Sequence, residues 1–255
     1  MTTILPTVHA TLGASSSHRW KECPGSVRLS EGIEDKSSPY AREGTAAHEL
    51  AAECLTRGGQ AADRIGDIIT VTEKEGDERV EYEIEVTEEM ATAVQTYVDA
   101  VREKAAMGNV VRIETRFDLT PLNPPAPMFG TADAVIYRRD DKHLFVDDYK
   151  HGQGVTVQAE NNPQLMYYAL GAVVDLQAKP EKITVTVHQP RSRADETVRA
   201  WTFGWDDLIA FKKDLFEAAE KTQQEDAPLN PGDHCRFCPL ADSCPESTVT
   251  APAAA

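Results

Sequence analysis

Short apolar runs, several of them alternating with polar residues, are separated by turn residues and predict β-strands. They cover residues 69–72, 80–86, 110–117, 130–137, 144–150, 183–187 and 197–203. The charged residues 138–142 between two of these strands have the length of a hairpin loop. The first two strands predict a second, acidic hairpin.

Longer stretches place apolar residues three and four positions apart and predict amphipathic helices. They are residues 41–57, 88–106, a helix that begins at residues 162–163, and 205–224. Gly58 and Gly59 end the first helix, and Pro163 suits the first turn of the third. These elements predict a single α/β domain over residues 1–246, in which helices flank a central mixed sheet. Residues 247–255 are predicted to be a disordered tail.

Composition narrows the class of protein. The chain has 255 residues, of which 41% are hydrophobic, enough for a core. No run reaches the ~18 apolar residues of a membrane span, and residues 1–14 lack the pattern of a secretory signal. We therefore expect a soluble, cytoplasmic protein that does not bind membranes. Its formal net charge of −16 argues against a generally basic nucleic-acid-binding surface and leaves room only for a local one.

Three charged residues of the predicted hairpin 130–150 form a candidate metal site. Asp148 and Lys150 are two positions apart, so their side chains are expected on one face of the sheet, and Asp133 on the neighbouring strand can reach that face. The two carboxylates could hold a divalent cation, while the ammonium orients water or stabilises phosphate charge. For Asp148 and Lys150 alone, an ordinary surface ion pair is the alternative.

The motifs around this hairpin resemble those of the PD-(D/E)XK nuclease superfamily, specifically its RecB-like exonuclease branch. In order along the chain they are a helical His48, Gly130-Thr-Ala-Asp133, Asp148-Tyr-Lys150 and Gln164-Leu-Met-Tyr-Tyr168. The resemblance extends over residues 14–246 and implies a restriction-endonuclease-like core of order αβββαβ within residues 41–223. It also implies Mg²⁺- or Mn²⁺-dependent hydrolysis of DNA, with exonuclease action favoured over site-specific cutting.

The same resemblance implies roles for individual residues. The expected metal ligands are His48, Asp133, Asp148 and, through its carbonyl oxygen, Tyr149. Lys150 is expected to position water or stabilise charge in the transition state. Glu114, on the preceding strand, is a candidate near the metal, or it pairs with Arg112 on the sheet surface. Gln164 and Tyr168 lie one helical turn apart and either contact the DNA backbone or brace the site.

The five cysteines are unevenly placed. Two residues separate Cys235 from Cys238 and five separate Cys238 from Cys244, whereas Cys23 and Cys54 lie far upstream. An odd number with this clustering indicates a metal site in a reducing compartment rather than disulfides. Three thiolates need a fourth ligand, for which Cys23 is the candidate. Cys54 falls in the predicted helix 41–57 and is expected to be a buried small hydrophobe.

This cysteine spacing is similar to that of the iron–sulfur nucleases of the RecB-like branch, among them the CRISPR-adaptation and AddB-type nucleases. The resemblance implies a 4Fe–4S cluster that clasps Cys23 to residues 228–246. Zinc, held by the same cysteines with or without His234, is the alternative. In either case the metal is expected to be structural, so its loss would loosen the whole domain.

The whole sequence also resembles phage- and prophage-encoded members of this branch. That resemblance implies DNA ends, single- or double-stranded, as substrate in phage recombination or replication, beside a single-strand annealing or binding protein in the host cytoplasm. A homo-oligomer is compatible with the sequence. The competing hypothesis is a non-catalytic, metal-clasped DNA-binding or scaffold subunit with a vestigial nuclease site; the retained acids and lysine argue against it.

Overall fold

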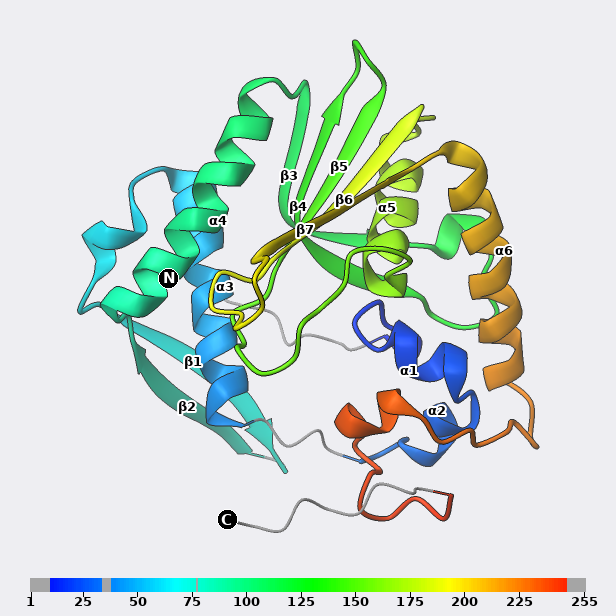
Figure 1. Cartoon of the computed structure of the whole chain (residues 1–255). Coiled ribbons are helices and arrows are strands. Elements are labelled where there is room, and N and C mark those ends of the chain that lie inside the picture. Colours follow the sequence, from blue (N-terminus) through cyan, green and yellow to red (C-terminus); the bar gives the residue numbers. More distant parts are fainter. Residues whose placement is uncertain (1–9, 34–37, 77, 247–255) are drawn as a thin grey trace.

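The structure is a computed structural model that describes residues 10–33, 38–76 and 78–246 (Figure 1). Its centre is a five-stranded sheet of order β3-β4-β5-β6-β7. The strands are β3 (Val110–Asp118), β4 (Phe129–Arg138), β5 (His143–Tyr149), β6 (Lys182–His188) and β7 (Val198–Phe203). Neighbouring strands are antiparallel except β5 and β6, which are parallel and are connected through α5 (Pro163–Leu176). The predicted mixed sheet is confirmed.

Helices cover both faces of this sheet (Figure 1). One face carries α5 and α6 (Trp205–Thr222), together with the short helices α1 (Ser17–Glu22) and α2 (Gly25–Leu29). Its core includes Trp20, Tyr167, Val185 and Leu215. The other face carries α3 (Pro39–Arg57) and α4 (Glu88–Ala106), whose apolar stripes form a second core. Burial of apolar side chains on both faces holds β4 and β5 in the middle of the molecule.

The acidic hairpin forms a separate two-stranded sheet of β1 (Ile68–Glu75) and β2 (Glu78–Glu85). Ile69 and Val71 of β1 are buried in the core that α3 and α4 share. Three short 3₁₀ helices complete the described elements: η1 (Ala61–Arg64), η2 (Thr120–Leu122) and η3 (Asp233–Phe237). No helix in the described residues is long and apolar enough to cross a bilayer.

Most of the predicted elements are confirmed, with local differences at their ends. The first long helix begins at Pro39, because the Ser38 hydroxyl accepts a hydrogen bond from the Ala41 N–H and caps it. The short helix α2 begins at Gly25 and has no predicted counterpart. Lys150 follows the last residue of β5 instead of lying within the strand. The predicted tail 247–255 lies outside the described residues.

Candidate metal centre and cysteine pocket

Asp133 and Asp148 lie opposite each other on paired strands. The β4–β5 register pairs Ala134 with Asp147, so the antiparallel ladder places Asp133 across from Asp148. Both carboxylates are buried, with 9% and 2% of the residue exposed. Asp133 Oδ2 accepts a hydrogen bond from the backbone N–H of Tyr149 at 2.7 Å. Hairpin pairing therefore brings these two acids together, as the sequence predicted.

His48 of α3 and Glu114 of β3 complete a group around Asp133. His48 Nδ1 lies 3.4 Å from Asp133 Oδ1 and 4.0 Å from Glu114 Oε1. One ligand atom from each of the three residues lies within 4.8 Å of the others. An imidazole nitrogen with two carboxylate oxygens is a donor set suited to a divalent cation such as Mn²⁺.

The backbone of Glu114 is distorted inside its strand. Its φ of 44° is in the left-handed region, which a non-glycine residue adopts at a cost of about 1–3 kcal/mol. The β3–β4 ladder pairs Ile113 and Thr115 with β4 but skips Glu114 between them. The register is the same on both sides of Glu114, so the distortion is confined to this residue, and its carboxylate approaches His48. Arg112 lies 3.7 Å from Asp175, so its alternative pairing with Glu114 does not occur among the described residues.

Lys150 is held between an acid and an amide. Its Nζ lies 3.0 Å from Asp148 Oδ2 and donates to Gln164 Oε1 at 3.3 Å. Gln164 Nε2 in turn donates to the Tyr168 hydroxyl at 2.9 Å, and Tyr168 is buried. The side chain of Asn162 caps α5 by accepting from the Gln164 N–H. Gln164 and Tyr168 thus brace Lys150, one of the two roles that the sequence left open; DNA contact by them stays a prediction.

Electrostatics in the site favour a bound cation. Partial desolvation and the neighbouring Asp133 raise the pKa of Glu114 to about 7, while 38% of its side chain stays exposed. Burial likewise raises the pKa of Asp148. Burial disfavours the charged form of His48, but the Asp133 carboxylate outweighs it and raises the His48 pKa. Two of the three carboxylates are therefore costly to ionise without additional positive charge.

The residues present fit a divalent metal ion. Asp148 Oδ2 is buried and has no hydrogen bond of good geometry, although the Lys150 ammonium lies near it. A buried carboxylate oxygen without such a hydrogen bond keeps lone pairs with which it could bind a cation. The convergent atoms of His48, Glu114 and Asp133 supply one nitrogen and two oxygen donors, and Asp148 lies across the ladder from Asp133.

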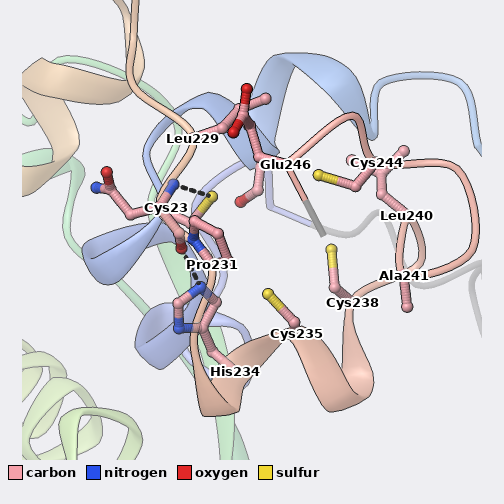
Figure 2. A pocket seen from close by; sticks show the side chains of 12 residues that line it. Cys23, Leu229, Pro231, His234, Cys235, Cys238, Leu240, Ala241, Cys244 and Glu246 are labelled. Atoms are coloured by element: carbon pink, nitrogen blue, oxygen red, sulfur yellow. Dashed lines mark hydrogen bonds between the residues drawn. The ribbon is translucent and has the colours of Figure 1, made fainter. Parts of the chain in front are cut away.

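Four of the five cysteines line a common pocket between the N-terminal helices and the C-terminal segment (Figure 2). They are Cys23, Cys235, Cys238 and Cys244, and their sulfur atoms are directed into the pocket (Figure 2). All five cysteines are free thiols. Cys54 instead lies in the core between α3 and α4, which confirms that it is a buried hydrophobe.

Backbone amides support two of these sulfurs. The N–H of Asn230 donates to Cys23 Sγ and that of Gly232 to Cys235 Sγ, each at 3.4 Å. Hydrogen bonds of this kind tune metal-bound thiolates. The His234 Nε2 is 2.9 Å from the Asn230 carbonyl oxygen, so that nitrogen is bound to backbone rather than directed at the sulfurs. Four convergent thiols fit either an iron–sulfur cluster or zinc.

Three polar residues near the candidate metal centre had no role in the sequence interpretation: His151, Lys104 and Glu43. His151 contacts the Tyr149 hydroxyl, and Lys104 of α4 donates to Asp147 at the other face of β5. Lys104 is 43 positions from Asp147, and Glu43, which contacts His151, is 108 positions from it. Hydrophobic periodicity carries no signal for contacts across such separations.

Three comparisons place the chain among known proteins. The family described as "Protein of unknown function (DUF2800)" matches residues 9–253. The crystal structure of SSO0001 is similar with a TM-score of 0.37 and 13% identity, over 93% of this chain and 87% of that one. The crystal structure of a phage-related exonuclease from Haemophilus somnus 129PT is similar with a TM-score of 0.31 and 14% identity, over 84% and 93%. At TM-scores this low, neither similarity supports an argument about function.

Proposed function

The chain belongs to the DUF2800 family, and we propose that it is a metal-dependent nuclease that hydrolyses DNA phosphodiester bonds. One observation carries the proposal. Ligand atoms of His48, Glu114 and Asp133 converge within 4.8 Å, beside an Asp148 that Lys150 contacts at 3.0 Å. Acids that can hold a cation, next to a half-buried ammonium, suit the hydrolysis of an anionic ester.

Several side chains of the site could donate to a metal ion. The residues that would hold Mg²⁺ or Mn²⁺ are His48, Glu114, Asp133 and Asp148, with the Tyr149 carbonyl as a further ligand by resemblance. When bound, such an ion polarises a phosphoryl oxygen and lowers the pKa of a bound water. The Tyr149 N–H fixes one oxygen of Asp133, which leaves the other oxygen directed toward His48.

Lys150 is proposed to act as a fixed positive charge. Burial disfavours its ammonium, but Asp148 and Asp133 outweigh burial and raise the pKa of Lys150 above its ordinary value. Its Nζ therefore stays protonated and donates toward negative charge that develops on the phosphate, instead of accepting a proton. Gln164 fixes one direction of the ammonium, and Tyr168 fixes the amide of Gln164.

We propose that the substrate is a DNA end processed exonucleolytically in phage recombination or replication, beside a phage single-strand annealing or binding protein. This part rests on the resemblance of the motifs. A net charge of −16 opposes broad electrostatic binding of DNA, so binding should be weak and sensitive to salt unless a partner protein adds positive surface. The alternative, a non-catalytic scaffold, predicts DNA binding without hydrolysis.

The test is degradation of labelled DNA with Mn²⁺ present. Linear duplex, single-stranded and circular DNA are compared for wild type, Asp148→Ala and Lys150→Ala. Lys142→Ala, an exposed lysine in the hairpin turn, is the matched control. We expect wild type and the control to degrade linear DNA, and the two site variants to be slower by at least about 100-fold. Equal rates in wild type and the site variants would leave only the scaffold alternative.

For the cysteine pocket we propose a structural 4Fe–4S cluster held by Cys23, Cys235, Cys238 and Cys244. The convergence of the four sulfurs supports a metal, and the resemblance in spacing favours iron over zinc. Iron and zinc contents and the visible spectrum of anaerobically purified protein decide between them. Cys235→Ala should lose the metal, whereas Cys54→Ala, in the core between α3 and α4, should keep it. Stoichiometric zinc in a colourless protein would exclude the cluster but not the nuclease.

A further inference from the structure

Tyr149 connects the candidate metal ligands to a second group of polar side chains. The residue is fully buried, and its ring lies edge-on to the imidazole of His48 with centroids 5.4 Å apart. Its backbone N–H donates to Asp133 Oδ2 at 2.7 Å. Tyr149 therefore contacts two of the three residues whose ligand atoms converge.

The hydroxyl of Tyr149 is fixed by three further residues, His151, Glu43 and Arg191, which we call the Tyr149 anchor. The hydroxyl lies 2.8 Å from His151 Nδ1. Arg191 NH1 lies 2.5 Å from His151 Nε2 and donates to Glu43 Oε1 at 2.9 Å. The same Nε2 also lies 3.1 Å from Glu43 Oε1, so this ring nitrogen contacts both the guanidinium and the carboxylate. The other ring nitrogen, Nδ1, is the one that contacts the Tyr149 hydroxyl.

The Tyr149 anchor joins the elements that carry the metal site. Glu43 lies on α3, the helix of His48, and His151 follows β5, the strand of Asp148. Arg191 follows β6, and its Nε also donates to Glu89 at 2.9 Å near the start of α4. The side chains of His151 and Arg191 are only 3% and 14% exposed. Charge-assisted hydrogen bonds of low exposure hold these elements in one relative position.

We propose that the Tyr149 anchor sets the position of His48 relative to Asp133 and so controls the affinity of the site for its divalent metal ion. The inference rests on the proposed function, because it assumes that His48 and Asp133 bind that ion. Glu43, His151 and Arg191 are positioning residues that act through the Tyr149 ring and N–H. Groups that orient metal ligands in this way typically contribute 10- to 100-fold in affinity.

Two variants test the anchor in the full-length protein with its cysteine-bound metal retained. Tyr149→Phe keeps the ring and the backbone N–H but removes the hydroxyl, and Arg191→Gln removes the guanidinium. Arg193→Gln, exposed in the same segment, is the matched control. Mn²⁺ affinity is measured by isothermal titration calorimetry and stability by thermal melting. We expect about tenfold weaker Mn²⁺ binding in both variants and none of this effect in the control. The double variant should bind little worse than either single one, because both changes release the same group.

A lower melting temperature with unchanged Mn²⁺ affinity would show that the anchor is only structural and would overturn the proposal. Asp133→Ala separates this failure from failure of the proposed function. If Asp133→Ala abolishes Mn²⁺ binding while Tyr149→Phe and Arg191→Gln bind as tightly as wild type, the metal site stands and the anchor does not. If Asp133→Ala binds Mn²⁺ like wild type, the metal site fails and the anchor fails with it.

Discussion

A buried ion pair behind the candidate site should contribute strongly to stability. Lys104 Nζ lies 2.5 Å from Asp147 Oδ1 and donates to Thr186 Oγ1 at 3.2 Å. Asp147 is fully buried, and the same oxygen lies 2.6 Å from His188 Nε2. Because consecutive strand residues face opposite sides, Asp147 is on the face opposite to Asp148. The pair thus links β5, the strand that carries part of the candidate metal site, to α4 and β6.

Lys104→Met removes the ammonium and keeps a side chain of similar length. It leaves the Asp147 carboxylate buried with His188 as its remaining side-chain partner. Breaking a buried pair from one side costs about 3–5 kcal/mol, and because 25% of the Lys104 side chain is exposed, we expect the lower end, about 3 kcal/mol. For a chain of this size each kcal/mol lowers the melting temperature by roughly 2–4 °C, so the expected fall is roughly 6–12 °C.

The matched control is Lys142→Met. Lys142 lies 2.7 Å from Glu181, a similar separation, but the two side chains are 55% and 68% exposed. Water and salt screen such a pair, so the control should melt with the wild type. Thermal unfolding followed by circular dichroism at physiological salt gives the comparison. If Lys104→Met and Lys142→Met shift the melting temperature equally, burial does not determine the strength of these pairs and the reasoning is wrong.

Three further predictions follow from single positions. Desolvation and the Asp133 carboxylate raise the pKa of Glu114 to about 7, and metal binding needs the Glu114 carboxylate. Protonation of Glu114 should therefore weaken Mn²⁺ binding as the pH falls through 7, by up to about tenfold between pH 8 and 6. Glu114→Gln should remove this part of the dependence in calorimetry and leave the part that comes from His48, whose pKa Asp133 raises. In Gly25→Ala the new Cβ would lie 2.5 Å from the Ala227 carbonyl oxygen. This clash, two residues from Cys23, should disturb the cysteine pocket, so the purified variant should contain less iron or zinc. In Gly130→Ala the Cβ would lie 3.0 Å from the Tyr168 ring; we expect lower nuclease activity with unchanged Mn²⁺ affinity, measured on the same preparation.

Sequence alone predicted the parts of the site that depend on local geometry. Alternation along a strand and the length of one hairpin loop were enough to bring Asp133 and Asp148 together. The helical spacing of Gln164 and Tyr168 likewise placed them on one face of the helix, where the structure has them in contact. Glu114 was not predictable in this way, because its φ of 44° breaks the alternation at its own position. Packing of the whole fold imposes a strained backbone of this kind. The residue types in β3 do not indicate it.

The cysteine pocket could be predicted from sequence alone, whereas the Tyr149 anchor could not. Both join residues far apart in the chain: Asn230 binds Cys23 across 207 positions, and Arg191 binds Glu43 across 148. The four cysteines could be grouped from sequence because cysteine is a rare residue and because a metal site needs a fixed number of ligands. Glutamate, histidine and arginine are common surface residues, and nothing in their chemistry selects one partner over another. Candidate ligands can therefore be predicted from sequence, whereas the residues that would position them can be identified only from the fold, which brings α3 close to the ends of β5 and β6.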